Sequence, residues 1–590
     1  MKLNPGQQEC VACATPLMVL APPGSGKTGT LVAKTTAILK SDPRAVVGLV
    51  TFTDAAAKEI QERVSKALPG RDGRRVIART FHSHGIEQLR AAGILGRILT
   101  PYESSAIVKE AAAEFPPVLD DNAPSPEAFL QEVKSRPEFT GNEAPFIAAY
   151  QERLRQLRAV DLQDITRDAL LGMRTGTVRR LPVSHLLADE WQDVDTNQLM
   201  WVLEHHNQGV ITGVVGDDDQ SIYGWRNSLG FEAFQAFKAH VSPTVVELSH
   251  NYRSNQEIID AATALVHHNV KRIPKVILAT RGTGGHIAVA NTSSKKAEAE
   301  YLLDMMSDDI STDDDGEVLI PQGRWGVLAR NNADLWLVGA RLRSARIPYT
   351  RSSKKDEYPF EIIAFCALLR ALQTGDQVNL ETALRAVGLA PSTITELSRR
   401  HGDQLFSIMD GEVPDVSFAP VEQAKALQSF AAVCRNWRRS TAEGRYRAVV
   451  DAVALWFQSN VVSAEQTDDF LNFTEILKRG PGTLNAKVNH ILQQQTRKHK
   501  SGVHLLTMHG SKGMEFDRVF ILQCNAGVTP SKHATSIEEE RRLFYVAMTR
   551  ARFELTLSYN PAKLASQFIA EAGCAGATAT AEVAATDSGS

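Results

Sequence analysis

Cysteine is scarce in this chain, since its 590 residues include only six. That number is too small for a disulfide framework and agrees with a reducing compartment. Cys10 and Cys13 have C-x-x-C spacing, whereas the other four cysteines stand singly. Because a closed zinc site needs four ligands, we do not expect a metal site at this pair.

The chain also lacks long apolar runs and an excess of charge of one sign. No run approaches the roughly eighteen apolar residues that span a bilayer, and no signal-peptide core follows the first residues, so we expect a cytoplasmic protein. The formal net charge is −3, and any nucleic-acid surface must therefore be a local groove. With 43% hydrophobic and 23% charged residues, the composition is that of an ordinary globular protein. The length indicates several domains.

A glycine-rich stretch near the start of the chain predicts a nucleotide-phosphate site. An apolar run at 17–20, predicted to be a buried strand, leads into it, and a helical pattern follows from Leu31. The stretch consists of Ala21, Pro22, Pro23, Gly24, Ser25, Gly26, Lys27 and Thr28. Its glycines let backbone N–H groups face phosphate oxygens, while Lys27 would reach the β- and γ-phosphates and Thr28 would help to hold Mg²⁺. A merely flexible turn would not explain the flanking strand and helix, but the loop alone does not choose between kinases, GTPases, transporters and helicases.

Two acids follow a second apolar run, at 183–188. Asp189 and Glu190 are what ATP hydrolysis requires at the end of such a strand, since one can hold Mg²⁺ and the other can polarise the attacking water. An acidic cap on the next helix is the alternative. It explains Asp193 and Asp195 well, but the first two acids much less well.

A third run, at 209–216, ends in a polar loop that carries Gln220. Tyr223, Trp225 and Arg226 follow within six residues. Exposed aromatic rings beside arginine form a platform on which bases stack, worth about 1–3 kcal/mol per base. Aromatic residues are also common in protein cores, and this alternative stays open from the residues alone. Upstream of the phosphate loop, Gln7 lies in a predicted helix at 3–15 and offers a carboxamide that could read an adenine edge.

The order of these patterns predicts an α/β fold with two parallel-sheet units, each interrupted by a mainly helical insertion. We expect a first unit at 1–82 and 161–248, its insertion at 83–160, a second unit at 249–375 and 500–569, and its insertion at 376–499. Residues 570–590 are rich in Ala, Thr, Gly and Ser and are expected to be disordered. ATP would bind in the cleft between the units. Arg253, and Arg550 in a helix predicted at 538–552, would face the phosphates across it.

Together the motifs resemble those of the UvrD/Rep/PcrA-like helicases of superfamily 1A, in order over about residues 3–570. The matching stretches are 3–7, 21–28, 51–59, 80–83, 189–193, 216–226, 251–254, 507–516 and 538–552. The resemblance implies two RecA-like domains, called 1A and 2A, with insertions 1B and 2B. It also implies an ATP- and Mg²⁺-dependent motor that moves 3′ to 5′ on single-stranded DNA and opens 3′-tailed duplex.

The resemblance further implies roles for individual residues. Gln7 and Tyr252 would hold adenine and Glu515 the ribose side. Lys27, Thr28 and Asp189 would hold the phosphates and Mg²⁺, Glu190 the catalytic water. Gln220, Arg253 and Arg550 would sense the γ-phosphate. The expected strand path is lined by Phe52, His82, Tyr223, Trp225, Arg226 and His509.

Three departures from the family pattern affect these expectations. Gly29 stands where relatives usually place an arginine that stacks on the base, the second insertion is short, and only residues 559–564 stand where relatives have a long duplex-splitting hairpin. A translocase that needs a partner, for example a nuclease in DNA repair or antiviral defence, is therefore a second hypothesis. A third is an ATP-switched nucleic-acid-binding module. Outside these motifs, no clustered acids with lysine indicate intrinsic nuclease activity, and we expect no DNA cleavage. The pathway, the choice between DNA and RNA, and the oligomeric state stay open.

Overall fold

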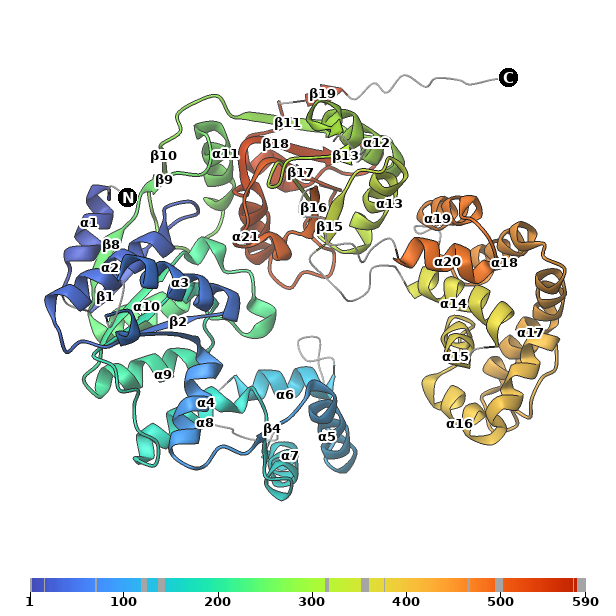
Figure 1. Cartoon of the computed structure of the whole chain (residues 1–590), viewed down its shortest axis with the longest axis horizontal. Helices are drawn as coiled ribbons and strands as arrows, with labels where there is room; N and C mark the ends of the chain where they lie inside the picture. Colours follow the sequence, from blue (N-terminus) through green and yellow to red (C-terminus); the bar gives the residue numbers. More distant parts are fainter. Residues whose placement is uncertain are drawn as a thin grey trace.

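The structure is a computed structural model that describes residues 3–14, 16–68, 72–117, 125–135, 144–312, 318–351, 360–375, 377–463, 467–493, 502–576 and 578–580. None of the helices within these ranges is long and apolar enough to cross a membrane. The expected α/β architecture is confirmed, because two parallel sheets lie beside each other and each carries a helical insertion (Figure 1).

The first sheet is fully parallel, with strand order β3-β2-β6-β7-β1-β8. Its strands are β1 (Leu17–Leu20), β2 (Val47–Thr51), β3 (Val76–Thr80), β6 (His185–Ala188), β7 (Ile211–Gly216) and β8 (Thr244–Glu247). Its helices are α1 (Pro5–Ala12), α2 (Lys27–Ser41), α3 (Asp54–Ala67), α9 (Thr196–Asn207) and α10 (Phe231–Val241). β1 and β2 are buried along their whole length, as expected for strands covered on both faces. Parallel pairing brings the carboxyl ends of β1, β6 and β7 to one edge.

The first insertion begins later than predicted. α4 (Phe81–Ala91) and α8 (Asp164–Thr175) pack into the core of the first sheet, where Phe81 and Leu89 are buried. A separate apolar cluster extends from Leu99 to Ala159. It joins α5 (Pro101–Glu114), α6 (Pro126–Lys134) and α7 (Ala144–Gln156), next to the short pair β4 (Arg97–Ile98) and β5 (Ala159–Val160). The boundary at 83 is thus corrected, because α4 covers the first sheet rather than the insertion.

The second sheet is also parallel, with order β15-β16-β14-β17-β18-β11-β19. Its strands are β11 (His286–Asn291), β14 (Trp325–Ala329), β15 (Tyr349–Arg351), β16 (Val503–Thr507), β17 (Phe516–Ile521), β18 (Ala551–Tyr559) and β19 (Thr578–Thr580). Its helices are α11 (Gln256–Val266), α12 (Lys295–Met306), α13 (Trp336–Ser344), α21 (Ile537–Met548) and α22 (Gln567–Glu571). Two short pairs accompany it, β9 (His250–Asn251) with β10 (Leu278–Ala279), and β12 (Ser311–Thr312) with β13 (Val318–Leu319).

Two predictions for this unit are wrong. The helix expected at 538–552 ends at Met548, so Arg550 lies after it and Arg552 lies in β18. The predicted start of the disordered tail, at residue 570, is too early, because Cys574 is buried and β19 pairs with β11. Residues 581–590 lie outside the described part.

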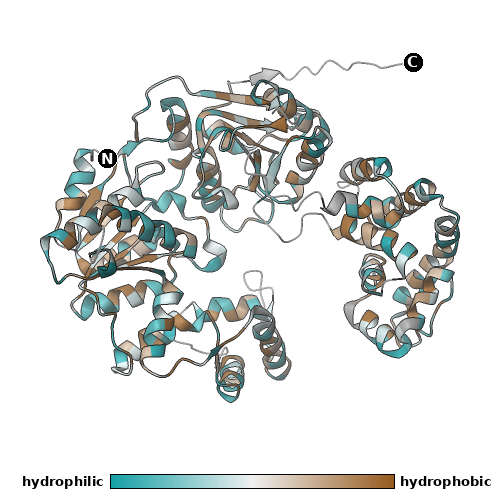
Figure 2. Ribbon diagram, in the orientation of Figure 1, coloured by the Kyte–Doolittle hydropathy of each residue, from teal (hydrophilic) through white to brown (hydrophobic). Residues whose placement is uncertain are grey.

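The second insertion is the separate all-helical lobe on the right of Figure 1. It contains α14 (Phe360–Thr374), α15 (Gln377–Ala386), α16 (Pro391–His401), α17 (Val421–Ala442), α18 (Tyr446–Asn460), α19 (Thr467–Arg479) and α20 (Leu484–Gln493). α14 packs against α15, α17, α18 and α20, so the described part of the lobe starts at Phe360 rather than at 376. Apolar residues lie between the helices and polar ones outside (Figure 2). Trp336 of α13 lies 5.7 Å from Phe473 of α19, ring centre to ring centre, and joins the lobe to the second sheet.

Candidate nucleotide and nucleic-acid site

A cavity of about 1200 Å³ lies between the two sheets. Its walls combine the phosphate loop, the acidic pair and the aromatic platform of the first unit with arginines of the second. The predicted site residues on its wall are Pro23, Gly24, Ser25, Gly26, Lys27, Thr28, Phe52, His82, Asp189, Glu190, Gln220, Tyr223, Trp225, Arg226, Tyr252, Arg253, Glu515 and Arg550. Gly29 also lines it. The structure therefore brings together residues that are more than 500 positions apart in the sequence.

The phosphate loop joins β1 to α2 through two left-handed glycines. Gly24 has φ +69° and Gly26 φ +79°, a region that side chains strongly disfavour. Gly26 caps α2 without any side-chain hydrogen bond, which leaves N–H groups of the first turn available to an anion. Ala21 and Pro22 are buried and are not part of the wall; the N–H of Ala21 donates to Gly216 O at 2.8 Å. These two residues support the loop.

The acidic pair faces the lysine of this loop. Lys27 Nζ lies 3.3 Å from Glu190 Oε2, and Gln192 Nε2 donates to the same oxygen at 2.6 Å. Burial and the neighbouring Glu190 charge raise the pKa of Asp189. Burial would also raise the pKa of Glu190, but Lys27, Lys512 and Gln192 outweigh it and lower that pKa. At neutral pH, Glu190 is thus an anion that can accept a proton.

The second unit contributes four arginines to the cavity wall, and two of them, Arg253 and Arg550, are predicted site residues. Arg550 is 1% exposed, its NH2 group lies 3.4 Å from Gln220 Oε1, and burial lowers its pKa to about 9. Arg253 Nε donates to Glu515 Oε2 at 2.8 Å. Glu515 also pairs with Arg552. The carboxylate predicted to face the ribose is therefore engaged with arginines in this structure.

The predicted adenine contacts take up different positions. Gln7 is fully buried behind the loop, where Nε2 donates to Ser25 O at 3.2 Å and Oε1 accepts from Asn4 N at 3.1 Å. It is not part of the cavity wall. Tyr252 does line the cavity, and its hydroxyl accepts a hydrogen bond from Asn4 Nδ2 at 2.8 Å. Asn4 and Gln7 form the capping box at the start of α1. Through these two residues, α1 links the phosphate loop to Tyr252.

Trp225 and Arg226 of the aromatic platform are exposed, whereas Tyr223 is half-buried and packs against the core of the second sheet. Trp225 is 59% exposed, and the Arg226 guanidinium lies 4.4 Å from its ring centre. Phe52 and His82 lie on the wall of the same cavity. His509 is not on that wall but supports the platform, 6.3 Å from the Tyr223 ring centre.

Sequence reasoning missed two residues that join the units. Lys512 Nζ donates to Asp193 Oδ2 at 2.5 Å and to Gln220 O at 3.1 Å, and lies 4.9 Å from the Tyr223 ring centre. Asn251 Nδ2 donates to Pro23 O at 2.6 Å. The available signal for Lys512 was its place between two glycines, in a loop that follows a buried strand.

Comparisons with known proteins agree with this arrangement. The UvrD/REP helicase N-terminal domain model matches residues 3–100 and 100–241, and the UvrD-like helicase C-terminal domain model matches 246–381 and 421–562. The ATP-dependent DNA helicase PcrA of Leuconostoc citreum is 27% identical over 94% of this chain and 81% of its own length. The ATP-dependent DNA helicase Rep of Escherichia coli is 26% identical over 95% of this chain and 91% of its own. The chain therefore belongs to the UvrD-like family of ATP-dependent DNA helicases.

Proposed function

We propose that this protein couples ATP hydrolysis to movement along single-stranded DNA in the 3′ to 5′ direction and separates the strands of 3′-tailed duplex. The observation that carries the proposal is a single cavity with phosphate-binding groups from the first unit, arginines from the second and an aromatic platform. Closure of the units on a nucleotide would move the arginines and the platform together. Such coupling is what a motor needs.

Glu190 is the proposed general base, since it is anionic and lies beside Lys27. It would take the proton of the water that attacks the γ-phosphoryl group. Arg253 and Arg550 would stabilise the negative charge that develops on the transferred group. Arg253 gives its Nε–H to Glu515 and one NH1 hydrogen to Thr549 O, so the rest of its five N–H donors could meet a phosphate while this ion pair is kept.

Mg²⁺ fits the donor set. The Thr28 hydroxyl and the Asp189 carboxylate lie on the same cavity wall, and oxygen ligands of this type suit the ion. Bound there with ATP, Mg²⁺ would neutralise phosphate charge. The raised pKa of Asp189 favours a nearby cation, because a positive charge would stabilise the ionised carboxylate.

The test is ATP turnover with and without single-stranded DNA, followed by unwinding of 3′-tailed and 5′-tailed duplexes by the same preparation. We expect DNA to stimulate turnover and only the 3′-tailed duplex to open. Absence of DNA-stimulated turnover would refute the motor, and would favour an ATP-switched binding module if ATP still altered DNA affinity. If only the 5′-tailed duplex were unwound, the proposed 3′ to 5′ polarity would be refuted.

A second candidate is a translocase that requires a partner protein to open duplex. It is favoured by the connection between β18 and α22, where Lys563 N donates to Asn560 O and Ala526 N donates to Leu564 O in a compact turn. Stimulated turnover without unwinding of either duplex by the chain alone would support this candidate over the autonomous helicase.

A further inference from the structure

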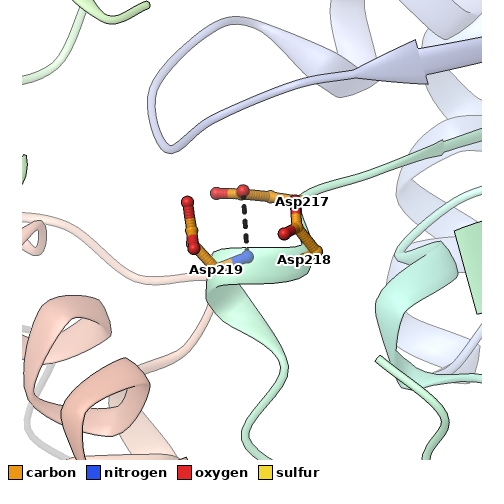
Figure 3. A group of neighbouring side chains, drawn as sticks. All are labelled: Asp217, Asp218 and Asp219. Atoms are coloured by element: carbon orange, nitrogen blue, oxygen red, sulfur yellow. Dashed lines mark hydrogen bonds between the residues drawn. The ribbon is translucent and has the colours of Figure 1, made fainter. Parts of the chain in front are cut away.

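Three consecutive aspartates lie directly after β7, at the edge of the first sheet. Asp217, Asp218 and Asp219 are fully buried, and their carboxylate oxygens lie within 4.8 Å of one another. Figure 3 shows the three carboxyl groups gathered at the short helix η4 (Asp218–Gln220), with the Asp219 N–H donating to Asp217. Buried carboxylates at this spacing repel one another, and a nearby cation stabilises their ionised form.

Lys275 supplies that cation from within the chain. Its Nζ lies 2.6 Å from Asp217 Oδ1, 2.6 Å from Asp218 Oδ1 and 2.8 Å from Asp219 Oδ2. An ammonium group has three N–H donors, so each donor meets one carboxylate. The Lys275 side chain is completely buried. It therefore fills the place that a metal ion would otherwise take.

Asp217 has a further contact that its two neighbours lack. Gln220 Nε2 donates to Asp217 Oδ2 at 2.8 Å. Because an ionised carboxylate only accepts hydrogen bonds, the amide nitrogen of Gln220 must face Asp217. The amide oxygen then faces the cleft, 3.4 Å from Arg550 NH2.

The backbone of Asp217 also connects to the proposed general base. Asp217 N donates to Gln192 Oε1 at 2.9 Å, and Gln192 Nε2 donates to Glu190 Oε2 at 2.6 Å. Asp217 thus connects Gln220, through its side chain, with Gln192 and Glu190, through its backbone. Gln220 and Glu190 are the groups expected on the two sides of the attacking water. A shift of the Asp217 side chain would turn Gln220 while the Asp217 backbone still held Gln192.

We propose that Asp217, held in place by Lys275, is a positioning residue that fixes the Gln220 amide with its oxygen toward the γ-phosphate site. In this orientation Gln220 offers an acceptor, which can hold the attacking water or the Arg550 guanidinium. The inference rests on the proposed ATP hydrolysis and adds a residue that acts on it through Gln220.

The test compares Asp217→Asn with the matched control Asp218→Asn in the full-length chain. Each removes one carboxylate charge next to Lys275, but only the first touches Gln220. An asparagine can turn its own NH2 toward Gln220 and so release the fixed orientation. We expect kcat of DNA-stimulated turnover to fall about tenfold further in Asp217→Asn than in the control, with a change in KM for ATP of about twofold or less.

The same substitution is then made in a Gln220→Ala background. If Asp217 acts through Gln220, it causes no further loss of kcat there. Equal loss in the two aspartate variants, or an independent loss in the Gln220→Ala background, would overturn the inference. If Asp217→Asn does not fold, Asp217→Glu replaces it, because the longer side chain keeps the charge beside Lys275 but moves the carboxylate that holds Gln220. Asp218→Glu is then the matched control, and the same two comparisons decide. Failure of the proposed function is distinct, because the unmodified chain would itself lack stimulated turnover.

Discussion

The two sheets share one architecture but use their carboxyl edges differently. In the first sheet, β1, β6 and β7 end in loops whose glycines, acids and amide line the cavity. In the second sheet, the ends of β17 and β18 are closed by Glu298 of α12. Its carboxylate accepts hydrogen bonds from Gln523 N at 3.0 Å, from Gln523 Nε2 at 2.6 Å and from the Ser558 hydroxyl.

This difference shows what separates a functional edge from a structural one. Glu298 is 2% exposed and its hydrogen-bonding capacity is met by its own chain, whereas the Glu190 side chain is 32% exposed and faces a cavity. A buried polar group satisfied internally stabilises the fold, and one that faces a cavity remains available to a ligand. The parallel-sheet fold alone therefore did not decide which edge binds nucleotide.

Glu190→Gln should have the largest effect. It changes the carboxyl edge of the first sheet, which faces the cavity and is called the open edge below. Loss of the proton acceptor should lower kcat for ATP roughly 10²–10⁴-fold, while ATP binding is retained because the phosphate loop is untouched. Steady-state turnover and binding of a fluorescent ATP analogue measure the two effects. Glu298→Gln is the matched change at the ends of β17 and β18 in the second sheet, called the closed edge below, and it should leave kcat unchanged. Normal turnover by Glu190→Gln would refute its role as base.

Lys512→Met should have the next largest effect, because it removes the cation that joins Asp193 and Gln220 of the first unit to the second. A coupling of typical size predicts a roughly tenfold loss of DNA-stimulated turnover. The measurement is the ratio of turnover with DNA to turnover without it. Lys238→Met, on the exposed side of α10, is the control. An unchanged ratio in Lys512→Met would show that the open edge works without this bridge.

Trp225→Ala tests whether the open edge extends to nucleic acid. Loss of one stacking surface should weaken single-stranded DNA binding by about 1–3 kcal/mol, which is roughly 5- to 150-fold in Kd. Fluorescence anisotropy with a labelled oligonucleotide measures the change. Phe115→Ala is the control, since that ring is 40% exposed but does not line the cavity. Equal affinity in the two variants would remove Trp225 from the strand path.

Much of the first unit follows from the sequence, because local patterns carry the information. The apolar run before Ala21, the glycines after it and the acids after Ala188 each predicted their place at the end of a strand. The strands of the second sheet were harder. β15 has three residues and β19 lies in a polar tail, so neither offers an apolar run that would reveal it. Only pairing with distant strands defines them.

The contacts between the units could not be predicted. Lys512 meets Asp193 across 319 positions, and Lys275 meets Asp217 across 58. No periodicity links such residues, since their proximity depends on how two separately folded sheets come together. Gln7 is a case within the first unit, because its carboxamide faces Ser25 O behind the loop instead of the cavity. The residue type was enough to propose Gln7 as a site residue, but the direction in which its side chain points is visible only in the folded structure.

Glu298→Gln should have the smallest effect and sharpen the comparison from the closed edge. Burial raises the pKa of Glu298 from its ordinary value near 4.5 to about 7. The folded state then binds a proton more tightly than the unfolded chain. The stability this contributes is present below about pH 4.5 and is lost as pH rises through about 7.

Glutamine keeps the shape of this side chain and does not titrate. Relative to the unmodified protein, the thermal midpoint of Glu298→Gln should therefore rise by several degrees between pH 5 and pH 8, about the shift expected for 2–3 kcal/mol in a domain of this size. Scanning calorimetry at the two pH values measures it, with ATP turnover as the companion measurement. A difference in midpoint that does not depend on pH would mean that the Glu298 carboxylate is not held in its protonated form. A fall in turnover would mean that the carboxyl ends of β17 and β18 also contribute to function.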